Sequence, residues 1–119
     1  MKQILSELSF KTPGEGFINI TNSINEWLTE TQIEQGIIII TMQHTSCSLI
    51  INENADPNVL RDLSTYLKAL VPEKGFRSLD STNDHFNYKH SQEGIDDMPA
   101  HIKTALTCSS LSLSINRNK

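Results

Sequence analysis

The chain has no long hydrophobic run and no excess of basic residues, and each shortage excludes a class of partner. Its longest aliphatic run, Ile37 to Ile40, falls far short of the roughly 20 apolar residues that a membrane-spanning helix needs. With 10 lysine and arginine residues against 14 acidic ones, the net charge is −4, which gives no basic footprint for nucleic acid. We therefore expect neither a membrane nor a nucleic-acid partner.

The first residues are not expected to form a secretory signal, and the chain has only two cysteines. The first residues, MKQILSELSF, interrupt their apolar side chains with Ser6 and Glu7, whereas a signal peptide has a continuous apolar core. We expect a cytoplasmic protein. Cys47 and Cys108 form no CxxC pair, so buried thiols are expected rather than a disulfide or a metal site.

A length of 119 residues suits one domain over residues 1–119 with a modest core. Periodicity and turn residues divide the chain into mixed helices and strands, which predicts the α+β class. The expected elements are a half-buried strand over 3–10, a helix from Thr21 or Asn22 to Gly36, a strand over 37–40, an alternating strand from His44 to Asn52, a helix from Asp56 to Pro72, an irregular loop over 73–95, a helix opened by Asp96 and Asp97, and a strand over 111–115.

Two of these elements have strong local signals. Ile37 to Ile40 are four consecutive β-branched residues, which is typical of a central strand covered on both faces. Asp56 directly before Pro57 is the pattern of a capped helix start, because proline is favoured at the first helical position.

Three of the four histidines are expected on polar surfaces: His44 on the alternating strand, His90 in the long loop and His101 in a first helical turn. Neutral imidazole is the commonest zinc ligand, and three protein ligands with one open position are the arrangement of catalytic zinc sites. The spacing matches no known ligand motif, so separate surface or capping roles stay an alternative to a shared site.

Polar residues near these histidines offer further chemistry. Asn52, Glu53, Asp96 and Asp97 are able to orient an imidazole, transfer protons or hold a hard cation. Asp96 and Asp97 precede a helix, however, where aspartate is favoured simply as a cap.

Two long blocks then carry a resemblance: QHTSCSLIINENADPNV at 43–59 and YKHSQEGIDDMPAHIKTAL at 88–106. They resemble the signature blocks of the YjbQ family, described as secondary thiamine-phosphate synthases. The resemblance implies a mixed or antiparallel, sandwich-like sheet with flanking helices, assembled as a homotrimer. It also implies that the chain is C-terminally shortened, since family members continue through a further strand after the position of Ile115.

The same resemblance implies a pocket in which His44, His90 and His101 hold a metal, with zinc expected and magnesium as the alternative. It places His44, Asn52, Glu53 and Asp97 as candidate catalytic residues, and it matches Asn54 to a position near the pocket.

The resemblance finally implies an enzyme that joins hydroxymethylpyrimidine diphosphate to a thiazole phosphate with release of pyrophosphate, and so a small phosphorylated substrate. Two alternatives stay open from the residues themselves. One is a non-catalytic trimeric module that binds a metal or a metabolite, and the other is a metal-dependent hydrolase acting on a small molecule.

Overall fold

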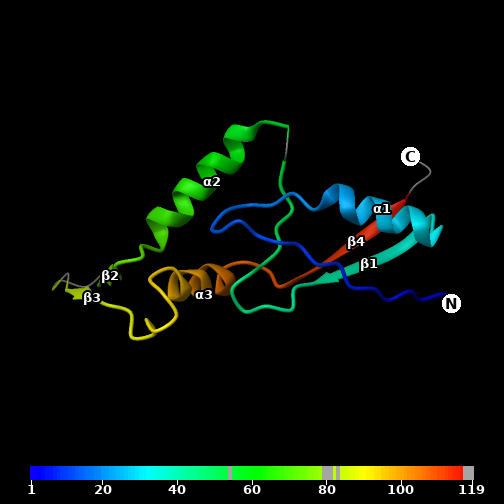
Figure 1. The fold of residues 1–119 in the computed structure, drawn as a ribbon. Coiled ribbons are helices and arrows are strands. Elements are labelled where there is room, and N and C mark those ends of the chain that lie inside the picture. The colour runs from blue at the N-terminus through cyan, green and yellow to red at the C-terminus, as the bar shows by residue number, and fades with distance from the viewer. Residues whose placement is uncertain (54, 79–81, 83, 117–119) are drawn as a thin grey trace. The chain divides into compact units, whose positions relative to one another are not determined.

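The computed structural model describes residues 1–53, 55–78, 82 and 84–116 of the 119-residue chain (Figure 1). Helices and small antiparallel sheets give the predicted α+β class. The chain divides into two compact units, one made of Met1–Ile38 with Leu113–Lys119 and the other of Ile39–Ser112. The single domain expected over residues 1–119 stays a prediction. No helix in the described part of the chain has the length and apolar character needed to cross a membrane.

The first helix, α1 (Thr21–Thr31), does not begin with the predicted cap. Ile20 is the N-cap residue and offers no side-chain hydrogen bond, so neither Thr21 nor Asn22 is the cap, and the Thr21 backbone N–H donates instead to Asn19 Oδ1 at 3.0 Å. The helix ends at Gln32, whose φ of 59° is left-handed, rather than continuing to Gly36. The preceding residues 3–10 form no strand, which makes that prediction wrong.

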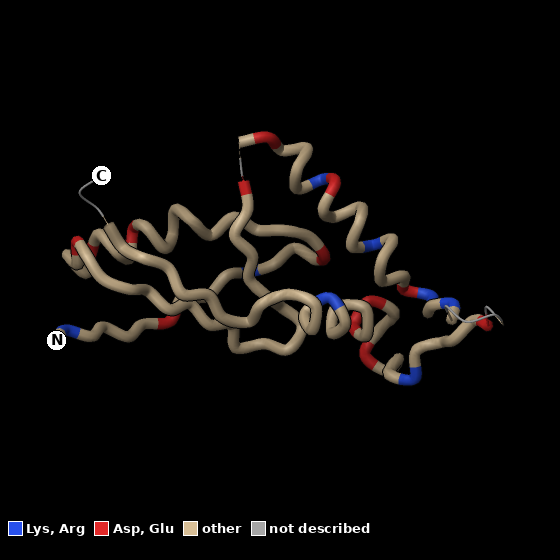
Figure 2. The backbone as a smooth tube through the Cα atoms, turned by 180° about the vertical axis from the view of Figure 1, so that it is seen from behind, with Lys and Arg blue, Asp and Glu red and all other residues tan. Residues whose placement is uncertain are grey.

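The second helix, α2 (Pro57–Leu70), begins at Asp56 and Pro57 as the sequence predicts. Asp56 Oδ1 accepts a hydrogen bond from the Asn58 backbone N–H at 2.9 Å, which satisfies one of the free donors of the first turn. Acidic and basic residues alternate along the helix and the residues after it (Figure 2). The helix ends directly before Val71 and Pro72, as a proline in that position favours.

The loop predicted over residues 73–95 contains a short hairpin, so the prediction is wrong in part. β2 (Phe76–Arg77) pairs antiparallel with β3 (His85–Phe86), and Phe76 stacks on Phe86 with ring centroids 5.5 Å apart. Tyr88 Oη donates to the Pro72 carbonyl at 2.6 Å, and burial raises the pKa of Tyr88. Two-residue strands are too short for an alternation pattern to announce them.

The third helix, α3 (Asp97–Ala105), begins where the sequence predicts, but its aspartates do not cap it in the expected way. Asp96 occupies the N-cap position and its side chain makes no capping hydrogen bond. Its backbone carbonyl accepts the first hydrogen bond of the helix, from the Ala100 N–H at 3.1 Å. The Asp97 side chain is therefore available for a different role.

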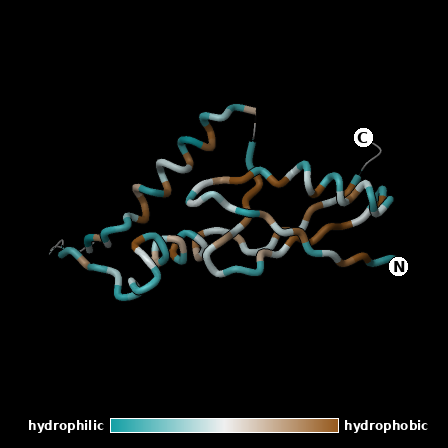
Figure 3. The backbone as a smooth tube through the Cα atoms, in the orientation of Figure 1, coloured by the Kyte–Doolittle hydropathy of each residue, from teal (hydrophilic) through white to brown (hydrophobic). Residues whose placement is uncertain are grey.

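Strands β1 (Gln35–Thr41) and β4 (Ser110–Asn116) form a two-stranded sheet. Side-chain exposure alternates along β4 as predicted, with Ile115 buried. The run of isoleucines is apolar along β1 (Figure 3), but Ile37 and Ile39 are 74% and 68% exposed, so the expectation of a strand covered on both faces is wrong. With only β4 beside it among the described residues, β1 is not the centre of a sheet in this chain.

The segment after β1 is not the alternating strand that the sequence predicted from His44 to Asn52. Thr45 and Ser46 form a turn, and a single antiparallel bridge joins Leu49 to Cys108, whose carbonyl accepts from the Leu49 N–H at 2.7 Å. Both cysteines are free, and Cys108 is exposed rather than buried as expected. Because this segment is irregular, the Thr45 backbone carbonyl faces the side chain of His101 on the third helix.

Candidate metal centre

The first turns of α3 place Asp97 and His101 on one face of the helix. Residues four apart on a helix are neighbours, so the two side chains project side by side. Asp97 Oδ2 lies 3.2 Å from His101 Nε2. Helix geometry alone therefore brings the carboxylate to the imidazole.

His90 reaches the same carboxylate because a tight turn precedes α3. The Gly94 N–H donates to the Ser91 carbonyl at 3.4 Å, and Gly94 adopts a φ of +117° that other residues rarely take. A Cβ atom at Gly94 would lie 2.9 Å from Asp96 Oδ1. This glycine is thus required for the turn that carries His90 back toward Asp97.

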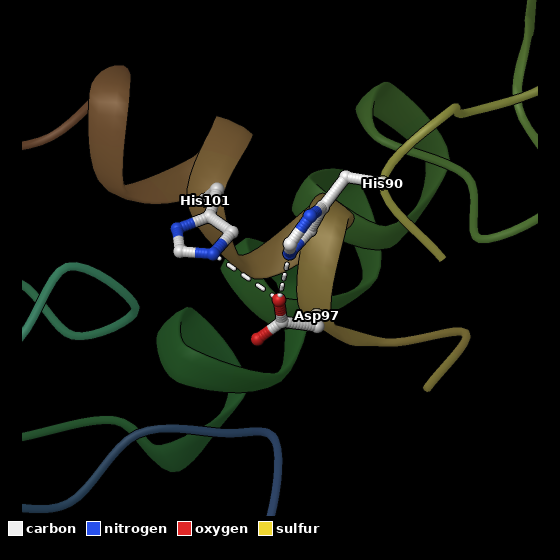
Figure 4. A group of neighbouring side chains, drawn as sticks. All are labelled: His90, Asp97 and His101. Atoms are coloured by element: carbon white, nitrogen blue, oxygen red, sulfur yellow. Dashed lines mark hydrogen bonds and ion pairs between the residues drawn. The ribbon is translucent and has the colours of Figure 1, made fainter. Parts of the chain in front are cut away.

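The three side chains meet at a single oxygen atom (Figure 4). His90 Nε2 lies 2.7 Å from Asp97 Oδ2, and the two imidazole rings are 5.4 Å apart in an edge-on arrangement. Among the described residues, His90, Asp97 and His101 form the group whose ligand atoms all lie within 4.8 Å of one another. Their side chains are 46%, 20% and 32% exposed, so the site is open to solvent.

A backbone carbonyl sets which nitrogen of His101 faces the cluster. His101 Nδ1 lies 3.3 Å from the Thr45 carbonyl, and a carbonyl can only accept, so Nδ1 carries the proton in this contact. In the neutral ring, Nε2 then presents a lone pair to Asp97 Oδ2. Two lone pairs that face each other need either a second proton on the ring or a cation between them. Metal-bound histidines commonly have this second contact, which fixes the tautomer and the ring orientation.

The contacts of Asp97 favour its ionised form. The hydrogen bond from His90 is the largest cause that holds the pKa of the Asp97 carboxyl below its usual range, although partial desolvation acts in the opposite direction. A hydrogen bond with Glu93 and the charges of both histidines lower this pKa further. An ionised carboxylate is the form that binds a metal ion.

The observed spacings fit the donor separation of a small tetrahedral metal site. Zinc bonds of 2.0 to 2.2 Å to nitrogen and oxygen put neighbouring ligand atoms about 3.3 Å apart in a tetrahedron. The contact between His101 Nε2 and Asp97 Oδ2, at 3.2 Å, already matches that separation. The contact to His90 Nε2, at 2.7 Å, would have to open by about half an ångström, which side-chain rotation in an exposed group allows.

The structure brings together only part of the predicted site. His90, His101 and Asp97 converge, whereas His44 is exposed and is not a member of this close group. Asn52 and Glu53 are also exposed, and Asn52 Oδ1 accepts the Glu53 backbone N–H at 2.7 Å. Asn54 lies outside the described residues. The metal and catalytic roles assigned to these residues stay predictions.

Two groups of the site had no place in the sequence-based prediction. The Thr45 carbonyl has no signal in the sequence, because any residue could supply it. Glu93 had one, since it is an acidic residue only three positions after His90 and four before Asp97. Its Oε2 lies 3.8 Å from His90 Nε2.

Comparisons with known proteins place the chain in one family. The UPF0047 protein YjbQ-like family matches residues 6–119. UPF0047 protein sll1880 of Synechocystis is 42% identical over 108 residues, covering 91% of this chain and 67% of that protein. UPF0047 protein YjbQ of Escherichia coli O157:H7 is 34% identical over 113 residues, covering 94% of this chain and 74% of that protein.

The fold is shared with a solved structure of the same family. A YjbQ/UPF0047 protein of Clostridium acetobutylicum superposes with a TM-score of 0.74 at 33% identity, covering 92% of this chain and 75% of that one. The similarity supports the α+β assignment independently of the sequence patterns.

These comparisons correct the expected activity. Thiamine-phosphate synthesis was implied by the resemblance, but the matching family and the relatives are known only as UPF0047 proteins, and their names carry no synthase or transferase function. The prediction of a thiamine-phosphate synthase is therefore wrong as an assignment for this chain. The family prediction itself is confirmed, and the chain belongs to the YjbQ-like UPF0047 family.

Proposed function

We propose that this protein binds a divalent transition metal, zinc, through His90, Asp97 and His101. The observation that carries the proposal is the convergence of two Nε2 atoms on Asp97 Oδ2, at 2.7 and 3.2 Å. The Thr45 carbonyl supports it further, because its contact with His101 Nδ1 leaves the Nε2 lone pair directed at the carboxylate.

The donor set favours zinc over magnesium. Magnesium prefers oxygen ligands in octahedral geometry, whereas two imidazoles with one carboxylate suit zinc or another late transition metal. Such a site supplies Lewis-acid chemistry when a metal is bound. The residues of this chain would hold the ion and fix the orientation of the imidazoles.

Metal content of purified variants tests the proposal. We expect wild-type protein to bind close to one zinc per chain by elemental analysis and titration, and His90→Ala, Asp97→Asn and His101→Ala to weaken zinc binding at least about tenfold. His85→Ala is the matched control, because His85 is exposed and contacts Asn87 instead. Zinc-free wild type, or cluster variants that bind as well as the control, would overturn the site.

A separate variant tests whether His44 is a metal ligand. The resemblance implied that His44 is a ligand, whereas its side chain is not in the close group. If the three clustered residues suffice, His44→Ala binds zinc as the His85→Ala control does. If His44 joins the site when metal binds, its replacement weakens binding as much as His90→Ala.

We also propose that the chain assembles as a homotrimer, with the exposed isoleucines of β1 contributing to the contact. Ile37 and Ile39 present adjacent apolar side chains on one face of the strand, and such exposed apolar surface favours association. Light scattering of the purified protein would give the assembly state directly. A cytoplasmic location and a small phosphorylated ligand stay predictions.

A further inference from the structure

Glu93 lies beside the metal centre without belonging to its closest three groups. Its Oε2 is 3.8 Å from His90 Nε2, the ring nitrogen that also contacts Asp97 Oδ2 at 2.7 Å. The Glu93 side chain is 68% exposed, so it is free to change rotamer without displacing packed neighbours. It is the next donor beyond the three that already converge.

The separation of Glu93 from His90 is close to that of two ligands of one ion, although Glu93 is not in the group of three whose ligand atoms all lie within 4.8 Å of one another. Ligand atoms around a tetrahedral zinc ion lie about 3.3 Å apart, so the 3.8 Å separation has to close by about half an ångström. The turn that precedes α3 holds the backbone of Glu93, because Gly94 takes its positive φ directly after it. Rotation of the exposed Glu93 side chain then has to bring its carboxylate toward Asp97 and His101 as well.

The negative charge around this turn also supports a role for Glu93 in binding a metal ion. Glu93, Asp96 and Asp97 are three acidic residues within five positions at the start of α3. Figure 2 shows where acidic residues lie along the backbone. Neighbouring carboxylates repel each other, and a divalent ion bound among them would relieve that repulsion.

We propose that Glu93 supplies the fourth protein ligand of the metal centre. The inference rests on the proposed zinc site at His90, Asp97 and His101. It makes the site a closed set of two nitrogen and two oxygen donors, and closed sites of four protein ligands are typical of structural zinc. An external anion then enters only by displacing the exposed Glu93 carboxylate.

The rival interpretation makes Glu93 a surface ion partner of His90. An exposed pair of this kind contributes little to stability and does not coordinate metal. The two interpretations differ in metal affinity and in access of external ligands, and neither readout depends on knowing a substrate.

The first measurement is zinc affinity by competition with a chromophoric chelator for wild type, Glu93→Gln and Glu93→Asp. We expect Glu93→Gln to weaken binding at least about tenfold, as the loss of a ligand costs at least as much as the loss of a group behind it. Glu93→Asp keeps the negative charge on a shorter side chain, so we expect its zinc affinity to lie between those of wild type and Glu93→Gln. Glu34→Gln is the control, since Glu34 is also exposed and lies outside the 90–101 segment. Circular dichroism verifies that each variant is folded.

The second measurement uses cobalt(II) in place of zinc and follows its visible spectrum during azide titration. A site closed by Glu93 binds azide weakly in wild type and more tightly in Glu93→Gln, because removing the carboxylate opens a position. Equal zinc affinity and equal azide binding in wild type and Glu93→Gln would overturn the role of Glu93 while leaving the three-residue site intact. Wild type that binds no zinc would overturn both proposals.

Discussion

At the scale of single residues, the sequence around Asp97 is compatible with a helix cap or with a site carboxylate, and the structure favours the second. An aspartate at a helix start is often a cap, but here the carboxylate faces His90 and His101. Because Asp97 is the first residue of α3, its side chain lies on the same helix face as His101, and the turn through Gly94 brings His90 to it. The residue-scale predictions therefore concern these two positions.

The lowered pKa of Asp97 predicts a stability change in acid. A carboxyl whose pKa is lower in the folded than in the unfolded state stabilises the fold above the unfolded value, and this contribution is lost as the pH falls through the folded value. We expect wild type to be more stable than Asp97→Asn from neutral pH to about pH 5, and the difference to shrink at lower pH.

Urea unfolding at a series of pH values, with a chelator present to remove metal effects, measures this difference. Asp62→Asn on α2 is the control for a general change of charge, since Asp62 is exposed. A difference between Asp97→Asn and wild type that stays constant down to pH 2 would contradict the prediction.

Gly94→Ala should disturb the turn that brings His90 to the cluster. A Cβ at this position meets Asp96 Oδ1 at 2.9 Å and is strained at a φ of +117°, which costs about 1 to 3 kcal/mol. Thermal unfolding should show a lower midpoint, and zinc titration a weaker affinity. Gly36→Ala is the control, because its Cβ would meet only Ile33 at an ordinary 3.7 Å.

At the scale of elements, the start of α2 is the clearest case of local chemistry setting a boundary. Asp56 accepts the Asn58 N–H, and Pro57 occupies the first helical position where no N–H is needed. Asp56→Ala should therefore lower the free energy of unfolding by about 1 kcal/mol, within a range of roughly 0.5 to 2. Asp56→Asn keeps a cap and should stay close to wild type in the same urea titration. Equal losses in both variants would assign the effect to charge rather than capping.

The hairpin of β2 and β3 is an element that local chemistry did not announce. It depends on Gly75, since a Cβ there would collide with the Phe86 carbonyl oxygen, and on the stacking of Phe76 on Phe86. The first contact joins the residue before β2 to β3, and the second joins the two strands. The pairing partner, rather than the composition of either strand, creates the element.

At the scale of the whole molecule, the exposed face of β1 leads to a prediction about assembly. Replacing both Ile37 and Ile39 with threonine keeps β-branched residues in the strand while removing apolar surface. Light scattering should report a smaller assembly than wild type at equal concentration. Ile51→Thr is the control, because Ile51 is also exposed, at 65%, but lies outside the strands. An unchanged mass for the double variant would exclude these side chains from the contact.

The sequence by itself determined the elements whose signals are local. The aspartate and proline before α2, the isoleucine run of β1 and the alternation of β4 each act within a few residues, and the family followed from two long blocks. Local sterics and capping hydrogen bonds act in the same way wherever the segment lies, so they are readable without a fold.

Only the tertiary structure decided which polar groups meet. It joined His90 and His101 through Asp97 and left His44 outside the close group, and it supplied the Thr45 carbonyl that orients one ring. It also decided that β1 keeps two isoleucines exposed, where the run of apolar residues predicted cover on both faces. Burial and ligand convergence depend on segments distant in the chain, and the residue type at one position does not specify what will lie opposite it.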